Sequence, residues 1–531
     1  MRLSLVPPVR SAQRQLPGLR LPPAKVDAES TLKRFEKARV KKEQFNCILD
    51  EIYSLFMPNR NRFDGTVSPG QEKNRDALDS TPVKAASKLA GRLQSVLYPA
   101  FREWVKLEAG SDTPKDQRRQ VDEALEEQTE ILFDHINASN FATAAHEATA
   151  DLITGTASMQ VQDGRLEEPL EFNAIPLSEV VPEEGPNGLI ETNFRERKVC
   201  LRDIKRLWPR AELPEQMQRR ATDNPTEEVC LVEGCVYDYE TNSYQYCVIE
   251  KGDKAVLFQE RMSLSPIITF RWSKLAGETL GRGPCFDALP SARTLNYAKS
   301  LVFRHAESII APPILTDGDN GQLNPGSFDF SPGYVNVVNN IDRIREFVKQ
   351  GRIDLAMIIA EEERQQIREA MYVSKTSPGE GAVRSATEWV LAQKELLDDI
   401  GGQFPRLYGE FLFRLVRQAS AILVRRGKMA PIKVDGRDVT VRFVGPLAQA
   451  QDQDDILSIQ RFLEVMAPLG QELTMLTMRA EDLGEEVADK TGFPKRLVRS
   501  AEERKQIQQV VAQMVAAQQQ AAQAGGGRPA A

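Results

Sequence analysis

Apolar residues recur every three or four positions over residues 30–154, which is the spacing of one face of an α-helix. The pattern predicts a first long helix over 30–55, ending before Pro58. Two further helices are predicted over 115–136 and 141–154. The first part of the chain is therefore expected to be helical.

A helix start is expected at Thr81-Pro82. A threonine at the N-cap accepts a hydrogen bond from a free backbone N–H, and proline at the first helical position has no N–H to leave unpaired. This helix is predicted to end before Pro99.

From about residue 157 the apolar residues alternate in short runs separated by Gly, Pro and Asn, which predicts a β-rich region. The expected strands are 158–162, 170–175, 189–197, 229–239, 244–250, 255–260 and 267–272. Two small helices are expected between them, at 201–208 and 214–221. Cys230, Cys235 and Cys247 lie in these strands and are interpreted as packed thiols, because no CxxC pair or nearby His completes a metal site.

Helical spacing returns over 288–310 and again over 354–372. The stretch between them is turn-rich and contains a predicted strand at 334–338. A Gly-, Ser- and Pro-rich loop follows at 374–385.

A long helix begins after this loop and carries apolar residues to Leu423. Gly401-Gly402 and Pro405 are expected to bend it.

The two ends of the chain differ from the rest in composition. Residues 1–27 are rich in proline and carry Arg and Lys, which predicts a disordered basic arm: a plain flexible terminus, or an arm that touches a partner or nucleic acid. The last part, about 446–524, is helical in pattern but rich in Ala and Gln. Such a helix rarely folds alone, so it is expected to pack against copies of itself or to fray.

Charge limits the possible partners. The 531 residues include 69 Lys and Arg against 76 Asp and Glu, a net charge of −7. Affinity for duplex DNA comes mainly from Lys and Arg that displace counterions, so tight bulk binding of DNA is not expected.

Several classes of protein are disfavoured by missing motifs. No P-loop, HExxH or GxSxG motif occurs, and Gly281-Arg282-Gly283 is followed by Pro284 instead of completing a dinucleotide fingerprint. Glu361, Glu362 and Glu363 form a carboxylate run that is interpreted as a solvated helix face. We expect no enzyme activity, no cofactor and no metal.

The remaining signals concern compartment and calcium. No stretch approaches the 18 apolar residues of a membrane span, and no signal peptide is expected. The six cysteines are expected to be reduced. Asp317-Gly318-Asp319-Asn320-Gly321 is similar to a calcium loop, but Phe328 stands where the bidentate glutamate belongs, so a tight turn is the interpretation.

The order of short motifs along residues 30–510 resembles the portal, or head-to-tail connector, proteins of T7-like short-tailed bacteriophages. The motifs are, in chain order, 53–58, Leu78-Asp79-Ser80-Thr81, 89–93, Tyr98-Pro99, Trp104, Ile175-Pro176-Leu177, 185–188, Leu207-Trp208-Pro209, Phe270-Arg271-Trp272, Gly277-Glu278, 281–284, 288–290, 294–296, Ala311-Pro312-Pro313, 385–388, Arg406-Leu407 with Glu410, and 445–451. Leu280 departs from the pattern, since many relatives are expected to have an aromatic residue there.

The resemblance implies an α+β, mostly helical, elongated subunit with a β-rich wing, a helical stem, a small α/β clip and a C-terminal helical crown or barrel. The implied segments are the arm 1–27, the wing 28–287, stem helix 288–310, the clip 311–350, stem helix 351–373, the tunnel loop 374–385, a long kinked helix with short strands 386–445, and the crown with a disordered tail 446–531.

The same resemblance implies functional residues. The tunnel loop is expected to face DNA with Lys375, Thr376 and Arg384, although these are also compatible with ordinary solvated loop residues. The stem is expected to line the channel with Arg293, Lys299, Glu361, Arg364 and Arg368. The clip is expected to contact terminase or adaptor through Asp317, Asp319, Asn320 and Asn324.

The implied function is a ring of twelve copies at one capsid vertex, assembled in the host cytoplasm, through which double-stranded DNA is packaged and ejected. The implied partners are the terminase large subunit, tail adaptor and nozzle proteins, and the major capsid, scaffolding and internal core proteins, with no membrane. Twelve helices spaced ~10 Å apart enclose a bore of ~28 Å, wide enough for a duplex. The alternatives are another tail structural protein without a DNA channel, or a packaging enzyme.

Overall fold

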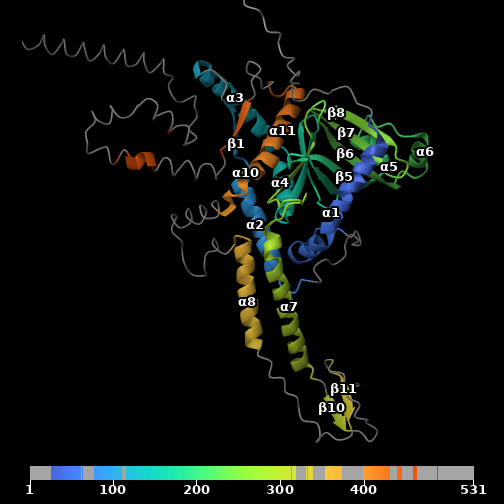
Figure 1. Cartoon of the computed structure of the whole chain (residues 1–531), viewed down its shortest axis with the longest axis vertical. Helices are drawn as coiled ribbons and strands as arrows, with labels where there is room; N and C mark the ends of the chain where they lie inside the picture. Colours follow the sequence, from blue (N-terminus) through green and yellow to red (C-terminus); the bar gives the residue numbers. More distant parts are fainter. Residues whose placement is uncertain are drawn as a thin grey trace, which may run out of the picture. The chain divides into compact units, whose positions relative to one another are not determined.

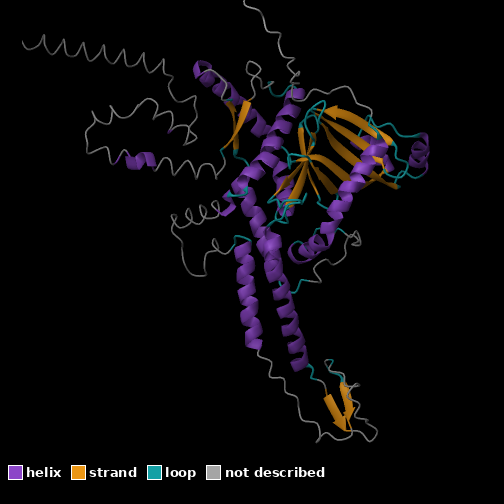
Figure 2. Ribbon diagram, viewed as in Figure 1, coloured by secondary structure: helices purple, strands orange, loops and turns teal. Residues whose placement is uncertain are grey.

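The computed structural model describes residues 26–60, 63, 77–110, 115–312, 314–317, 331, 333–338, 353–373, 399–430, 439–444, 458–462, 464 and 487. The chain divides into two compact units. The first comprises residues 1–101 and 131–431, and the second comprises 102–130 and 432–531. Helices and strands both contribute, as expected for an α+β protein (Figures 1 and 2).

Helix α1 (Ala28–Phe56) confirms the first predicted helix. Both carboxylate oxygens of Asp27 accept hydrogen bonds from the first free N–H groups, those of Glu29 and Ser30. Phe35 and Ile52, on one face of the helix, are fully buried.

Helix α2 (Thr81–Leu97) begins one residue earlier than predicted, with Ser80 at the N-cap. The prediction of Thr81 as the N-cap is therefore wrong by one position. The side chain that accepts from the helix start is Asp79, whose Oδ1 receives the Thr81 N–H at 2.8 Å and the Thr81 hydroxyl at 2.6 Å. A carboxylate is a stronger acceptor than a hydroxyl, which explains the difference.

A three-stranded antiparallel sheet forms the middle of the first unit. Its strands, in spatial order β3-β2-β9, are β3 (Leu170–Ile175), β2 (Thr156–Asp163) and β9 (Ile267–Arg271). Helix α4 (Phe141–Leu152) packs against β2 and β3. Because helices cover this sheet, β9 and most of β2 are buried along their whole length.

A five-stranded antiparallel sheet in sequential order adjoins it. The strands are β4 (Val180–Glu184), β5 (Ile190–Cys200), β6 (Glu228–Asp238), β7 (Ser243–Glu250) and β8 (Val256–Met262). One face packs on α1 through Phe35 and Phe194, whose ring centroids are 5.7 Å apart. The other face carries α5 (Leu201–Leu207) and α6 (Glu215–Asp223).

The strand pattern predicted the sheets well, with one omission. All seven expected strands and both small helices are present with shifted ends. Strand β4 was not predicted, because it is short and contains Pro182. Cys235 and Cys247 are buried free thiols, and burial raises the pKa of each to about 12.

Helices α7 (Pro284–Ile310) and α8 (Ile353–Ala370) lie side by side and extend away from the sheets (Figure 1). The predicted start of the first at residue 288 is wrong by four positions. Gly283 is the N-cap and Pro284 opens the helix, a position where proline costs nothing. Strand β10 (Ile314–Asp317) pairs in parallel with β11 (Val335–Val338); most residues of the expected clip lie outside the described part.

The predicted bend near Gly401-Gly402 is present as an interruption of the helix. A short helix, α10 (Phe404–Leu407), follows it, then a π-helical turn, η3 (Tyr408–Leu412), and α11 (Phe413–Arg425). The π-turn was not predicted.

The second unit contains a two-stranded antiparallel sheet of β1 (Val105–Ala109) and β12 (Val439–Phe443). Its helical part belongs to α3 (Lys115–Ala138), which confirms the predicted helix. Thr129 Oγ1 accepts from the Leu107 N–H at 3.1 Å, and Asp122 Oδ1 accepts from the Ala109 N–H at 2.9 Å. The residues of the expected basic arm 1–25, the tunnel loop and most of the crown lie outside the described part.

Candidate functional site

A network of ion pairs ties α8 to α7 and to the start of α2. The Arg364 guanidinium lies 2.8 Å from Asp79 Oδ2, and Lys299 Nζ lies 3.9 Å from the same oxygen. Glu361 continues the network along α8, 2.8 Å from Arg364 and 3.3 Å from Arg368. Three segments far apart in the sequence therefore meet at one carboxylate.

Asp79 is the buried centre of this network. Burial alone would raise the pKa of its carboxyl, but hydrogen bonds from Thr81 and Arg364 outweigh it and hold the pKa below its ordinary value of 3.8. Asp79 is thus ionised whenever Arg364 and Lys299 are charged, and it fixes the top of α8 against α2.

The structure gives each of the five residues predicted to line the stem an oppositely charged partner in its own chain. Lys299, Glu361, Arg364 and Arg368 belong to the Asp79 network. Arg293 lies apart from it and forms a two-pronged ion pair with Glu51 of α1. The sequence identified these charges but not Asp79 or Glu51, whose pairing has no local signal.

The other predicted functional residues are not brought together. Lys375, Thr376 and Arg384 lie outside the described residues, as do Asp319, Asn320 and Asn324. Asp317 ends β10, where it is in register with Val338 of β11.

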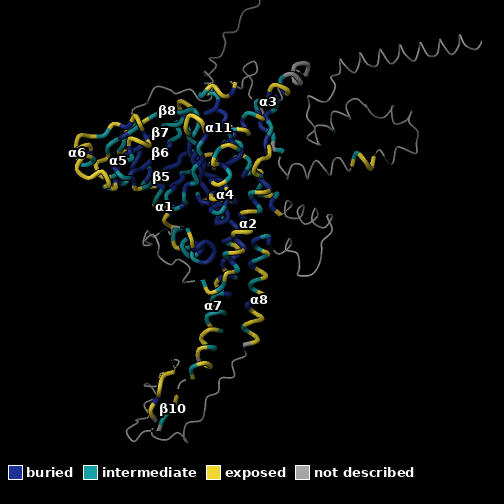
Figure 3. Tube along the Cα trace, turned by 180° about the vertical axis from the view of Figure 1, so that it is seen from behind, coloured by how far each residue is buried: buried dark blue, intermediate teal, exposed yellow. Residues whose placement is uncertain are grey.

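A cluster of exposed apolar side chains follows the free parts of α7 and α8, and Figure 3 shows this exposed stretch in yellow. We call it the stem apolar surface; its members are Tyr297, Leu301, Phe303, Ile309, Ile310, Leu355, Met357, Ile358 and Ile359. Ile358 is 63% exposed and Ile310 is 83% exposed. Apolar patches of this kind on soluble proteins mark interaction surfaces.

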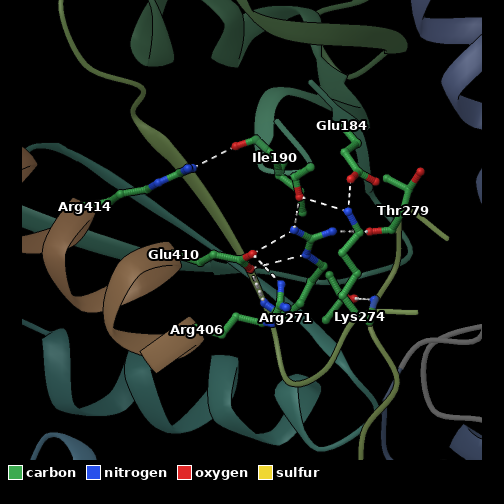
Figure 4. Close-up of polar contacts among 11 residues, drawn as sticks. Glu184, Ile190, Arg271, Lys274, Thr279, Arg406, Glu410 and Arg414 are labelled. Atoms are coloured by element: carbon green, nitrogen blue, oxygen red, sulfur yellow. Dashed lines mark hydrogen bonds and ion pairs between the residues drawn. The ribbon is translucent and has the colours of Figure 1, made fainter. Parts of the chain in front are cut away.

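A buried ion pair joins the helix after residue 399 to the sheets (Figure 4). Arg271, at the end of β9, and Glu410, in the π-turn, are almost fully buried. Glu410 Oε1 lies 2.7 Å from Arg271 Nη2, and Glu410 Oε2 accepts from the Arg271 backbone N–H at 3.0 Å. Arg271 also donates to the carbonyl oxygens of Gly188 and Thr279, at 2.9 and 3.3 Å.

The π-turn aligns two residue pairs at once. Phe411 stacks on Phe270 with ring centroids 4.0 Å apart, next to the Glu410–Arg271 pair. Both Phe270-Arg271-Trp272 and Glu410 are visible as sequence motifs, but only the structure shows that they are partners. π-turns of this type occur often at functional sites.

The glycine motif at 281–284 has a packing reason. Gly281 donates its N–H to Thr156 Oγ1 at 2.8 Å, and a Cβ on Gly281 would overlap the carbonyl oxygen of Gly155. A Cβ on Gly283 would overlap the carbonyl oxygen of Ile153. These glycines let the start of α7 lie directly against the end of α4, so they are structural residues.

Two searches of the described residues found no chemistry of another class. No group of three or more His, Cys, Asp or Glu side chains is arranged to hold a metal ion there. Among the same residues, no helix combines the length and apolar character needed to cross a bilayer.

Comparison with known proteins assigns the family. The model of the family described as "Bacteriophage head to tail connecting protein" matches residues 28–498. The chain is also 22% identical over 469 residues to a "Probable portal protein" of Bordetella phage BPP-1, covering 81% of each chain. The chain therefore belongs to the bacteriophage head-to-tail connecting proteins, a structural family of the phage particle and not a family of enzymes.

Proposed function

We propose that this chain is the portal subunit of its phage: copies close into a ring, twelve by analogy, and double-stranded DNA enters and leaves the capsid through the centre. The observation that carries the proposal is the stem apolar surface, which a single chain leaves open to water. A neighbouring copy would cover it.

The dimensions support a channel wall made of α7 and α8. Helix α7 has 27 residues and α8 has 18, so at 1.5 Å per residue they are about 40 and 27 Å long. Twelve such pairs in a ring would enclose a bore of ~28 Å.

The charges support passage of DNA without tight attachment. The basic residues proposed to line the stem (Arg293, Lys299, Arg364 and Arg368) are all paired with carboxylates, so few free cations there would hold phosphates. Guidance of the duplex is assigned to Lys375, Thr376 and Arg384 of the tunnel loop.

The proposed partners follow from the two ends of such a ring. The clip, including Asp317, Asp319, Asn320 and Asn324, would dock the terminase large subunit during packaging and tail adaptor and nozzle proteins afterwards. The wing would meet the major capsid, scaffolding and internal core proteins at the portal vertex, during assembly in the host cytoplasm.

Electron microscopy of the purified protein tests the ring. Closed rings are expected for the natural chain, and Ile358→Glu is expected to abolish them because it places a charge in the proposed interface. Leu166→Glu is the matched control: Leu166 is 90% exposed in the β2–β3 turn, outside the stem apolar surface, and this variant should still form rings. Absence of rings in the natural chain under all conditions would overturn the proposal.

Cross-linking separates a DNA channel from a tail protein without one. A photoreactive group at Lys375 should cross-link to DNA in filled heads, and the same group at the exposed Leu166 should not. If rings form but Lys375 gives no DNA cross-links, the ring assignment stands and the tunnel-loop assignment fails.

A further inference from the structure

A cleft of about 550 Å³ opens on the wing side of the first unit, away from α7 and α8. Its walls come from β7, β8 and the end of α5, from β2 and β3, and from α11. No role proposed above uses it.

The cleft has an aromatic floor held in a fixed arrangement. Trp208 and Tyr246 are 7% and 4% exposed, and Phe258 lies beside Tyr246. Trp208 Nε1 donates to the Tyr246 hydroxyl at 3.2 Å, which in turn donates to buried Glu233 at 2.8 Å. Because these polar groups are satisfied from below, the ring faces are presented without rearrangement.

The walls carry polar groups that have no partner. Gln418 is only 8% exposed, and its amide makes no hydrogen bond to any described residue. Gln160 accepts from Arg195 at 3.1 Å through Oε1, which leaves its NH₂ group without a described acceptor. Buried amides without partners are costly, so they indicate that a ligand supplies hydrogen-bond acceptors here.

One acidic group completes the lining. The Glu171 carboxylate accepts a hydrogen bond from Asn173 Nδ2 at 3.2 Å and is in no ion pair with a described residue. The cleft therefore offers aromatic faces, free N–H donors and one negative charge.

The first 25 residues repeat a motif with the complementary chemistry. The order apolar, Pro, Pro or Gly, apolar, basic occurs three times: VPPVR at 6–10, LPGLR at 16–20 and LPPAK at 21–25. Proline has a carbonyl acceptor but no N–H donor, so a proline-rich segment needs donors from its site. Such segments dock on aromatic-lined grooves in the polyproline II conformation.

The described chain begins beside this cleft. The Val26 N–H donates to Gln259 Oε1 at 3.2 Å, and Gln259 lies on β8 between Phe258 and Glu260, both of which line the cleft. Residues 6–20 can extend up to ~50 Å, so they can pass around the edge of β8. A segment tethered this closely has an effective concentration of the order of millimolar.

We propose that the proline motifs of residues 6–25 bind in this cleft of their own chain, with prolines on the aromatic floor, backbone carbonyls on Gln160 and Gln418, and the basic residue at Glu171. The cleft is thus a docking site that holds the basic arm on the wing.

Photo-cross-linking in the full-length protein tests this. With p-benzoylphenylalanine at Met262, which lines the cleft, cross-links are expected to residues 6–25. At Leu275, which is 48% exposed outside the cleft, they are not expected. Replacing the five prolines at 7, 8, 17, 22 and 23 by alanine should remove most of the yield from Met262, and Glu171→Lys should lower it about two- to fivefold. Glu171 is half-buried, so this variant is expected to fold.

Three outcomes would overturn the proposal. One is the absence of arm cross-links from Met262, and another is a yield that the proline and Glu171 variants leave unchanged. The third comes from rings prepared from a mixture of ¹⁵N-labelled and unlabelled chains. Cross-links within one isotope support docking in the same chain, and cross-links between isotopes would assign the cleft to a neighbouring copy's arm.

Discussion

Charged side chains in the interior of the first unit each lie against specific partners. Asp151 is buried at the end of α4, where its oxygens meet the Tyr53 hydroxyl at 3.1 Å and Arg60 at 3.2 Å. Arg271 and Glu410 form the second such group. Removing water from a charge costs several kcal/mol, so these residues make stability depend on pH and on single substitutions.

Asp151 predicts a stability change between about pH 4 and pH 6. Burial raises the pKa of its carboxyl from 3.8 to about 6, and the Arg60 charge only partly offsets this. Because the folded pKa lies above the unfolded pKa, ionisation disfavours the folded state. The natural chain should therefore lose about 2–3 kcal/mol relative to Asp151→Asn as the pH rises through this window.

Urea unfolding at several pH values measures this difference. Asp203→Asn, which removes a partly exposed carboxyl on α5, is the control and should show no comparable slope. Parallel stability curves for the natural chain and Asp151→Asn would contradict the prediction.

Glu410→Gln should be strongly destabilising. It keeps the shape of the side chain but leaves the Arg271 guanidinium buried without a countercharge, for which a loss of about 3–5 kcal/mol is expected. Arg406 also pairs with Glu410, at 3.2 Å, but its side chain is partly exposed, so Arg406→Gln should cost less than ~1 kcal/mol. Equal losses in the free energy of unfolding would refute the assignment of Arg271 as the main partner.

At the scale of elements, two irregular features fix how helices meet the sheets. The π-turn Tyr408–Leu412 places Glu410 and Phe411 together against β9. The glycines at 281 and 283 let α7 begin in contact with the end of α4. In both cases the backbone departs from a regular pattern where two elements must approach closely.

Substitutions of glycine separate close packing from helix propensity. Gly281→Ala should cost about 1–3 kcal/mol, because its Cβ would overlap the Gly155 carbonyl oxygen. Gly91 lies in the middle of α2 with nothing within 4 Å of an added Cβ, so Gly91→Ala should gain roughly 0.5–1 kcal/mol. Thermal or chemical unfolding of the two variants should move in opposite directions; a shift in the same direction would contradict this account.

At the scale of the whole molecule, charge and apolar surface have complementary consequences. The net charge of −7 disfavours tight attachment to DNA, and the stem apolar surface favours attachment to other copies. Both properties suit a subunit of the proposed conduit, in which copies must hold one another and let DNA slide.

The assembled protein is accordingly expected to bind a short free duplex weakly. At about 150 mM salt, fluorescence anisotropy with a labelled duplex should give a Kd no tighter than ~10⁻⁴ M. Micromolar or tighter binding, with log K falling steeply as salt is added, would show that the ring grips phosphates and would contradict the low-friction channel.

The sequence by itself determined the local structure and the family resemblance. Alternation gave seven of the eight strands between residues 156 and 271, and the three-to-four-residue spacing gave α1, α3, α4, α7 and α8. It could do so because the period of a strand or helix is a property of neighbouring residues. The order of motifs such as Gly281-Arg282-Gly283-Pro284 indicated the connector family, which the match over 28–498 confirms.

Only the tertiary structure decided which distant residues meet. Arg271 and Glu410 are 139 positions apart, and β1 pairs with a strand that begins at Val439. Asp79 looked like part of a helix start and proved to be the centre of the ion pairs of α7 and α8. Such contacts depend on how elements pack in space, and packing leaves no periodic signal in the chain, so no local pattern could have predicted them.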